Sequence, residues 1–222
     1  MQMKRITASE QIYNEIYSRI LFLELKPGED LNMKELLNEA GVSRSPLRDA
    51  LLKLQEDNLV EIFPQKGSCV TKINLHQVET ERFMRTTLEL AVVPLFAQKC
   101  TKENLLKMRS AIASQKIAIE GNNFKEFLMA DDAFHEIIFA GVGMERIWEI
   151  TKNQSGNYRR FRVLSSFIST LLNEIINEHE QILQAFTDND CDKALELEKA
   201  HLTKLHTEWN ILQREYPAYF EK

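Results

Sequence analysis

Apolar residues recur every three or four positions through most of the chain, a spacing that is typical of helices with one buried face. In the first part of the chain this spacing predicts helices over 8–24 and 32–40, and a third helix that begins at Ser43 or Ser45. Gly and Pro interrupt helical structure, and Pro27-Gly28 and Gly41 stand where these helices end. The first 57 residues therefore predict three consecutive helices.

The spacing of apolar residues changes after the third helix. It suits two short strands joined by a turn at Pro64–Gly67, with these apolar positions: Val60, Ile62, Cys69, Val70, Ile73. Three helices followed by a β-hairpin are the element order of a winged helix-turn-helix. We therefore predict a DNA-binding domain over residues 1–74.

Helical patterns fill the rest of the chain, and no strand pattern recurs. The predicted helices span 75–99, 102–120, 123–140, 144–162, 167–187 and 190–214. Because the predicted loops are short, we expect an antiparallel six-helix bundle over residues 75–222, in a mostly α protein. The aromatic tail "EYPAYFEK" is expected to pack on this bundle or on a partner subunit.

Composition and charge narrow the class of protein. The 222 residues are 44% hydrophobic and 27% charged, and no apolar run approaches the ~18 residues of a membrane span. The chain begins directly with helical periodicity rather than with a secretion signal, so we expect a cytoplasmic protein.

The charge of the chain limits how it could bind DNA. The formal net charge is −5, and residues 1–73 carry 10 Lys/Arg against 11 Asp/Glu. A DNA-binding surface must therefore come from the placement of charges.

The stretch "SRSPLR", residues 43–48, is the candidate for base recognition. The second helix of a helix-turn-helix enters the major groove, and arginine recognises guanine with two hydrogen bonds. Arg44 and Arg48 share a helix face, and the backbone N–H groups at the helix start attract phosphate. Lys66-Gly67 at the hairpin tip would face the minor groove or a phosphate. The alternative for the two arginines is a solvated helix face, with Arg48 paired to an acidic neighbour (Asp49 or Glu56). The alternative for Lys66-Gly67 is an ordinary turn.

Three of the five histidines lie on predicted bundle helices, among apolar residues that turn the same helix face inward: His135, His179 and His201. Asp131 lies one turn before His135 and points the same way. These residues form an N3O donor set that suits Zn, Ni, Fe, Co or Mn. Hydrogen-bonded core histidines without a metal are the alternative, and we expect His76 and His206 at the surface.

A metalloenzyme is the competing class of function. Di-iron carboxylate bundles use two Glu-x-x-His motifs and two further Glu residues. The sequence offers Glu198-x-x-His201 and Asp132-x-x-His135, which Glu174 and Glu178 could complete. Because Asp132 substitutes poorly for Glu, and because such an enzyme does not need a DNA-binding domain, we favour a regulator over an enzyme.

Residues 20–70, "ILFLELKPGEDLNMKELLNEAGVSRSPLRDALLKLQEDNLVEIFPQKGSCV", resemble the DNA-binding domain of the GntR family of bacterial transcription regulators. The shared pattern is a Pro-Gly turn, a helix with basic, acidic and Leu residues, the G-V-S-R-x-P-x-R-x-A-L run and a hairpin with a basic-Gly tip. The resemblance implies DNA contacts from these residues: Lys34, Ser43, Arg44, Ser45, Arg48, Gly67. The position of Lys66 at the hairpin tip adds it to the predicted contacts. Lys34 stands where the family often has arginine, and it suits phosphate better than a base. Ser45 stands where Thr is usual.

The predicted bundle resembles the effector domain of the FadR branch of that family, the FCD domain, in its shorter VanR-like form. Metal-binding members carry D-x3-H, E-H and H-L patterns, which correspond here to Asp131/His135, Glu178-His179 and His201-Leu202. The resemblance implies one divalent transition metal per chain, with Zn or Ni as the first candidates. It also implies a small carboxylate effector that binds at the open positions of the metal.

"MRTTLEL" resembles the family's R-x3-E pattern and makes Arg85 a candidate for binding the effector carboxylate. A plain Arg85–Glu89 salt bridge is the alternative. Arg159 and Arg162 are weaker candidates, which we expect on a solvated face.

The two resemblances together predict a homodimeric repressor without enzymatic activity that binds two operator half-sites of double-stranded DNA.

Overall fold

The computed structural model describes residues 6–167, 169–204 and 209–221. These residues divide into two compact units. We call Met1–Leu75 together with Glu215–Lys222 the N-terminal unit, and His76–Arg214 the helical unit. The predicted fold class, mostly α with a winged helix-turn-helix, is confirmed. Among the described residues, no helix has the length and apolar character that crossing a membrane requires.

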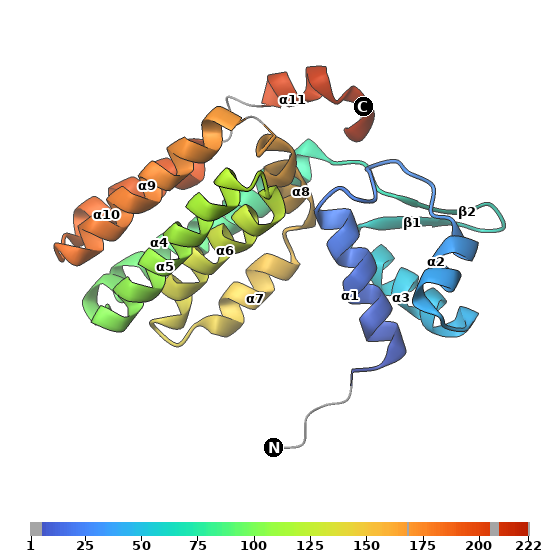
Figure 1. Cartoon of the computed structure of the whole chain (residues 1–222), viewed down its shortest axis with the longest axis horizontal. Coiled ribbons are helices and arrows are strands. Elements are labelled where there is room, and N and C mark those ends of the chain that lie inside the picture. Colours follow the sequence, from blue (N-terminus) through green and yellow to red (C-terminus); the bar gives the residue numbers. More distant parts are fainter. Residues whose placement is uncertain (1–5, 168, 205–208, 222) are drawn as a thin grey trace. The chain divides into compact units, whose positions relative to one another are not determined.

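The N-terminal unit contains three helices and a hairpin (Figure 1). Its elements are α1 (Ala8–Leu21), α2 (Met33–Ala40), α3 (Arg44–Glu56), β1 (Val60–Phe63) and β2 (Gly67–Val70). The strands are antiparallel, and Val60 lies opposite Val70. Apolar residues from α1, α3 and β2 form its core, among them Ile16, Ile20, Leu47, Leu54 and Val70. The periodicity that predicted these elements therefore also identified their buried face.

Local capping fixes where the helices of the helix-turn-helix begin and end. The side chain of Asn32 accepts hydrogen bonds from the first turn of α2, and Gly41 ends that helix in the left-handed conformation. Ser43 is the N-cap residue of α3, but its side chain makes no capping hydrogen bond. The Ser43 hydroxyl is exposed at the start of α3.

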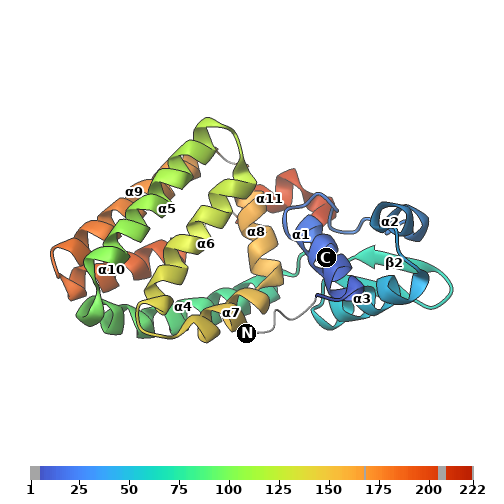
Figure 2. The same cartoon turned by 60° about the horizontal axis from the view of Figure 1, so that its bottom comes forward.

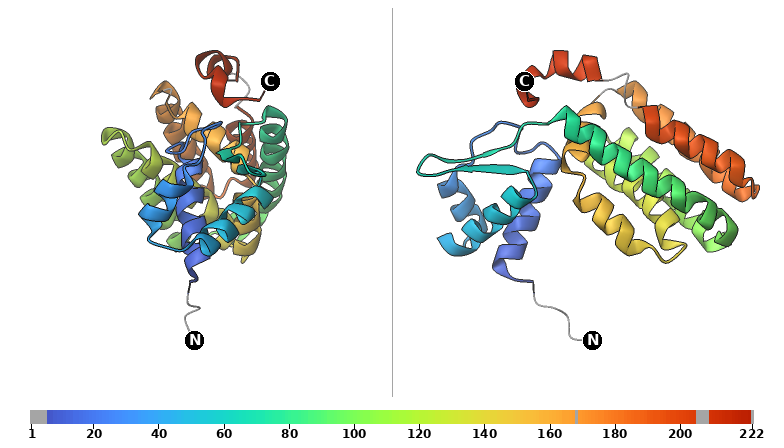
Figure 3. Two further views of the ribbon diagram at one scale, coloured as in Figure 1. Left: turned by 90° about the vertical axis from the view of Figure 1, so that its right-hand side faces the viewer. Right: turned by 180° about the vertical axis from the view of Figure 1, so that it is seen from behind.

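The C-terminal segment belongs to the N-terminal unit (Figure 3). Ile73 N–H donates to the Tyr219 carbonyl at 2.8 Å, and Glu221 N–H donates to the Ile73 carbonyl at 3.1 Å. Phe220 is 3% exposed. The tail therefore belongs to the N-terminal unit and not to the bundle, because its backbone pairs with the segment that follows β2. The alternative expectation, packing on a partner subunit, stays a prediction.

The helical unit is a bundle in which α5 packs on α6 and α9, and α9 packs on α10 (Figure 2). Its elements are α4 (Leu75–Lys99), α5 (Lys102–Glu120), α6 (Phe124–Ala140), α7 (Glu145–Asn153), α8 (Gly156–Ser165), α9 (Ser169–Thr187), α10 (Cys191–Thr203) and α11 (Trp209–Glu215). A short 3-10 turn, Pro217–Tyr219, follows α11 and belongs to the N-terminal unit.

Two of the predicted bundle helices are interrupted. The segment 144–162 forms α7 and α8: the backbone of Ser155 leaves the helical region, and the Ser155 hydroxyl donates to the Thr151 carbonyl at 2.6 Å. The segment 190–214 contains α10 and α11, and residues 205–208 between them lie outside the described part of the chain.

Candidate metal centre

Three helices of the helical unit supply the four predicted metal ligands. Asp131 and His135 lie one turn apart on α6, while His179 lies on α9 and His201 on α10. Asn123 caps the start of α6 and Asp190 caps the start of α10, which fixes the register of both helices. Asp131, His135 and His179 are buried, and His201 is half-buried.

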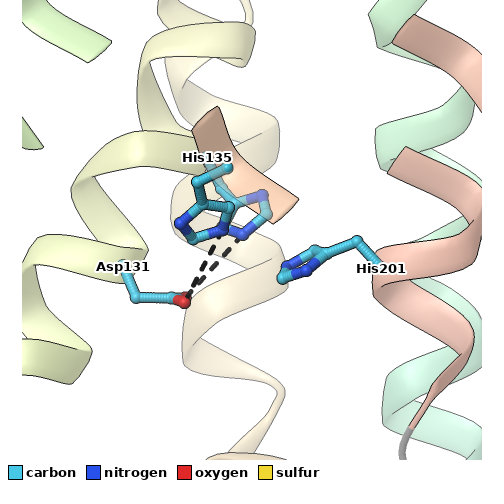
Figure 4. A group of neighbouring side chains, drawn as sticks. Asp131, His135 and His201 are labelled. Carbon is cyan, nitrogen blue, oxygen red and sulfur yellow. Dashed lines mark ion pairs between the residues drawn. The ribbon is translucent and has the colours of Figure 1, made fainter. Parts of the chain in front are cut away.

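The four side chains converge on one point, and Figure 4 shows three of them, Asp131, His135 and His201, pointing toward one another. The distance from Asp131 Oδ2 to His135 Nε2 is 3.7 Å, and the distance from Asp131 Oδ1 to His179 Nε2 is 3.8 Å. One ligand atom from each residue, His201 included, lies within 4.8 Å of the others. The structure therefore brings together all four residues that the sequence singled out as ligands.

Each imidazole is held through its other ring nitrogen. His135 Nδ1 contacts Glu89 Oε1 at 2.5 Å, His179 Nδ1 contacts Gln115 Oε1 at 3.0 Å and His201 Nδ1 contacts Glu178 Oε2 at 2.8 Å. An oxygen acceptor at Nδ1 keeps the ring proton there and leaves a lone pair on Nε2. Histidines that bind metals through Nε2 have this arrangement of outer partners.

Two of the Nε2 atoms are orphaned. In the described part of the chain, Nε2 of His135 and Nε2 of His179 are buried and have no hydrogen-bond partner. A buried polar atom without a partner is costly, which makes two such atoms beside a carboxylate unusual for a purely structural core. The residues present therefore fit a divalent metal ion.

Burial also sets the charge of these groups. Burial, reinforced by Arg85, holds the pKa of His135 well below 6.5, and burial, reinforced by His201, does the same for His179. Burial raises the pKa of Asp131, but Arg162 and His135 outweigh it and lower the pKa below its usual value. Neutral imidazoles beside an ionised carboxylate are the protonation states that bind a metal.

Arg159 and Arg162 are placed differently from the sequence-based expectation. Arg162 pairs with Asp131 and Asp132, and Arg159 Nη2 lies 2.8 Å from Asp132 Oδ2. The two arginine side chains are 16% and 13% exposed, respectively. The expected solvated face is therefore wrong for both arginines, because two neighbouring aspartates on α6 draw them inward.

A cavity of about 80 Å³ is lined by two of the four proposed ligands, Asp131 and His201. Polar side chains occupy part of its wall (Arg85, Asp131, Tyr158, Arg162, His201), and apolar ones form another part (Phe127, Leu128, Leu172, Ile175, Leu202). Arg85 Nε donates to Glu89 Oε2 at 3.1 Å, so the salt bridge predicted as an alternative is present. Among the described residues, however, its buried Nη2 has no hydrogen-bond partner.

The carboxylates of the di-iron interpretation do not gather at one site. Asp132 pairs with Arg159 and Arg162, while Glu174 and Glu178 pair with Lys204. Of the two remaining histidines, His76 is exposed as predicted and His206 lies outside the described residues. The four-carboxylate set that such an enzyme needs is therefore not assembled from these residues.

Two buried glutamates lie beside the four predicted ligands and were not part of that predicted set, although the di-iron alternative included Glu198. Glu89 and Glu198 are both 0% exposed, and with His135 they form a second group of potential ligands. Burial and the neighbouring Glu89 raise the pKa of Glu198 well above its usual value. The only sequence signal was spacing, since Glu89 follows Arg85 by one helical turn and Glu198 precedes His201 by three residues.

The predicted DNA-contacting residues are all exposed on the N-terminal unit: Lys34, Ser43, Arg44, Ser45, Arg48, Lys66, Gly67. Within the described part of the chain, Arg48 forms no ion pair with Asp49 or Glu56, which was the alternative role. Gly67 has φ +113°, a conformation that favours glycine, at the start of β2. These side chains are accessible, and their role in DNA binding stays a prediction.

Comparison with known proteins places the chain in a family. The model of the bacterial regulatory proteins of the gntR family matches residues 8–70, and the FCD domain model matches residues 82–204. The HTH-type transcriptional repressor RspR of Escherichia coli (strain K12) is 28% identical over 214 residues, which cover 96% of this chain and 94% of RspR. The HTH-type transcriptional regulator McbR of the same strain is 25% identical over 149 residues, 67% of either chain.

Solved structures share the fold. The structure of E. coli McbR/YncC covers 95% of this chain and 99% of its own, with a TM-score of 0.76 at 21% identity. A putative GntR regulator from Rhodococcus sp. RHA1 covers 95% of this chain and 98% of its own, with a TM-score of 0.76 at 18% identity. The chain therefore belongs to the gntR family, as a helix-turn-helix transcriptional regulator with an FCD domain, and it is not an enzyme.

Proposed function

We propose that this regulator is a dimeric repressor whose operator binding is controlled by a metal-dependent carboxylate effector. One divalent transition metal per chain is bound by Asp131, His135, His179 and His201. The observation that carries the proposal is that Nε2 of His135 and Nε2 of His179, both buried beside the Asp131 carboxylate, have no hydrogen-bond partner among the residues that the structure describes.

The donor set favours Zn or Ni, while Fe, Co or Mn are also compatible with three imidazoles and one carboxylate. When bound, the metal supplies an electrophilic centre whose remaining coordination positions accept oxygen ligands. Glu89, Gln115 and Glu178 hold the three rings in the ligating tautomer through their Nδ1 atoms.

The adjoining cavity supports a small carboxylate as the effector. Arg85 lines the cavity, and its buried Nη2 lacks a partner among the described residues, so a carboxylate oxygen would satisfy it. The apolar wall formed by Phe127, Leu172 and Leu202 would contact the carbon skeleton of the effector. A cavity of about 80 Å³ favours a compact metabolite over a long acyl chain.

DNA binding follows from the helix-turn-helix of the N-terminal unit. We assign base contacts to Arg44 and Arg48 on α3, and phosphate contacts to Lys34. Ser43, Ser45, Lys66 and Gly67 complete the contact surface. A two-fold dimer binds two half-sites, and an effector that prefers one arrangement of the dimer shifts operator affinity. Repression is proposed because RspR, at 28% identity, is named a repressor.

Metal content of the purified full-length protein tests the site. We expect about one divalent metal per chain in the wild type and in His76→Ala, which removes an exposed histidine away from the site. We expect the His179→Ala/His201→Ala double variant to contain no stoichiometric metal. A wild type that takes up no metal, even after incubation with Zn or Ni and dialysis, would contradict the proposal.

A further inference from the structure

Two carboxylates meet one ring nitrogen behind the proposed metal site. Glu89 Oε1 lies 2.5 Å and Glu198 Oε1 lies 3.2 Å from Nδ1 of His135. All three side chains are 0% exposed, so water does not compete for these contacts. Nδ1 and Nε2 are the two ring nitrogens of His135, and the ligands of the proposed metal site lie at Nε2.

We propose that Glu89 is a positioning residue that holds His135 in the metal-binding tautomer and links the metal to Arg85. Its carboxylate is divided between two partners: Oε1 accepts from His135 Nδ1 at 2.5 Å, and Oε2 accepts from Arg85 Nε at 3.1 Å. The role of Glu89 toward the metal rests on the proposed function. Its effect on the tautomer of His135 exists with or without a metal.

The distances distinguish the roles of the two glutamates. A neutral imidazole has one N–H to donate, and Glu89 is the nearer acceptor by 0.7 Å. Glu89 also forms an ion pair with Arg85, whereas among the described residues Glu198 forms no ion pair with an arginine or a lysine. Glu89 is therefore the residue that fixes the ring.

The same distances argue against a second metal at Nδ1. A nitrogen and an oxygen that bind one metal at about 2.1 Å each stand roughly 3 Å or more apart. The separation of 2.5 Å between His135 Nδ1 and Glu89 Oε1 is too short for two ligands of one metal and leaves a short, direct hydrogen bond between the two side chains.

The chain of contacts from Arg85 through Glu89 to His135, which we call the relay, has a consequence for regulation. A carboxylate outside the ligand shell raises the basicity of the histidine it holds, and so strengthens metal binding. Arg85 lines the effector cavity and shares Glu89 with His135. An effector carboxylate that accepts a hydrogen bond from Nη2 of Arg85 would partly neutralise the guanidinium that pairs with Glu89. Effector binding would then change the affinity for the metal, and metal binding would change the affinity for the effector by the same factor.

Three variants of the full-length protein test the relay. Glu89→Leu removes the acceptor, Glu89→Gln keeps an acceptor oxygen without the charge, and Glu198→Gln is the matched control at the same ring nitrogen. Two quantities are measured: the imidazole Nδ1–H signal of His135 in ¹H–¹⁵N spectra of metal-free protein, and the affinity for Co²⁺ or Zn²⁺ in competition with a chromophoric chelator. Thermal unfolding verifies that each variant is folded.

We expect Glu89→Leu to lose the Nδ1–H signal and to bind metal roughly 10–100-fold more weakly. Glu89→Gln should keep the signal and bind metal at an intermediate affinity. Glu198→Gln should keep both the signal and an affinity within about twofold of the wild type. A Glu198→Gln variant as impaired as Glu89→Leu would overturn the proposal, and so would a stoichiometry of two metals per chain.

The two proposals can fail separately. If the wild type binds no metal but Glu89→Leu alone loses the Nδ1–H signal, the metal function fails and the positioning of His135 by Glu89 stands. If the wild type binds one metal and Glu89→Leu keeps both the signal and the affinity, the relay is wrong and the metal site stands.

Discussion

Arg162 is paired with the carboxylate of Asp131: its Nη2 donates to Oδ2 of Asp131, while its Nη1 donates to Oδ1 of Asp132 at 3.0 Å. Asp131 Oδ2 is also the oxygen that lies 3.7 Å from His135 Nε2. The guanidinium and a metal ion would therefore share one carboxylate group, and the positive charge of Arg162 opposes a cation at the site.

Replacing Arg162 should strengthen metal binding. We expect Arg162→Gln to raise Zn²⁺ affinity roughly tenfold, equivalent to about 1.4 kcal/mol, because it removes a cation that competes for Asp131. Arg159→Gln is the matched control, since Arg159 pairs with Asp132, which is not a proposed ligand. Chelator competition measures both variants. Equal affinities for Arg162→Gln and the wild type would show that the guanidinium does not compete with the metal.

The buried histidines predict how the stability of the metal-free protein depends on pH. The pKa values of His135 and His179 are lower in the folded than in the unfolded chain, where a histidine titrates near 6.5. Below about pH 6.5 the unfolded chain therefore binds protons that the folded chain excludes, and stability falls by up to about 1.4 kcal/mol per histidine per pH unit. Above that pH this contribution to stability is fully present.

Urea unfolding of metal-free protein at pH 7.5, 6.5 and 5.5 measures this effect. His179→Gln should show a shallower decrease than the wild type, while the exposed His76→Ala should match the wild type. A free energy of unfolding that stays constant down to pH 5.5 would mean that these imidazoles are not held neutral by the fold.

The recognition helix α3 should determine operator affinity. After an operator is obtained by selection from random DNA, Arg44→Ala and Arg48→Ala should each weaken binding by about 1–3 kcal/mol. Lys34→Ala should weaken binding to all DNA sequences by a similar factor. It should also reduce the slope of log affinity against log salt concentration by about one. Arg109→Ala, an exposed arginine on α5, is the control. Unchanged gel shifts for both α3 variants would rule out α3 as the base-contacting element.

The C-terminal segment should stabilise the N-terminal unit. Phe220 is buried, and the backbone on both sides of it pairs with Ile73. Phe220→Ala should cost about 3 kcal/mol in the free energy of unfolding, within the usual range for a buried phenylalanine. Pro217→Ala, at an exposed position of the same segment, should cost far less. A Phe220→Ala protein as stable as the wild type would exclude a structural role for the tail.

Much of the fold could be predicted because its determinants are local. The helix over 102–120 matches α5 at both ends, since Thr101 forms a capping box and Gly121 ends the helix. Asp131 and His135 share a face because they are four residues apart. Their meeting with His179 and His201 followed from the family resemblance, which supplied the contacts between helices that spacing alone cannot give.

The remaining features depend on packing between distant segments. The Glu89–His135 contact joins residues 46 positions apart, and the tail returns to Ile73 from the far end of the chain. The break at Ser155, where the backbone leaves the helical region, escaped prediction because no proline marks it in the sequence. Arg162 resembled a surface residue because arginines are seldom buried without a partner, and its partners lie on another helix.

The most direct test of the central claim is anomalous diffraction at the metal edge from crystals of the full-length protein grown with Zn²⁺ or Ni²⁺. The account predicts one strong peak per chain, bound by Asp131 and by Nε2 of His135, His179 and His201. A peak at Glu89 and Glu198 instead, or no peak inside the helical unit, would contradict the assignment of these four residues as the metal centre.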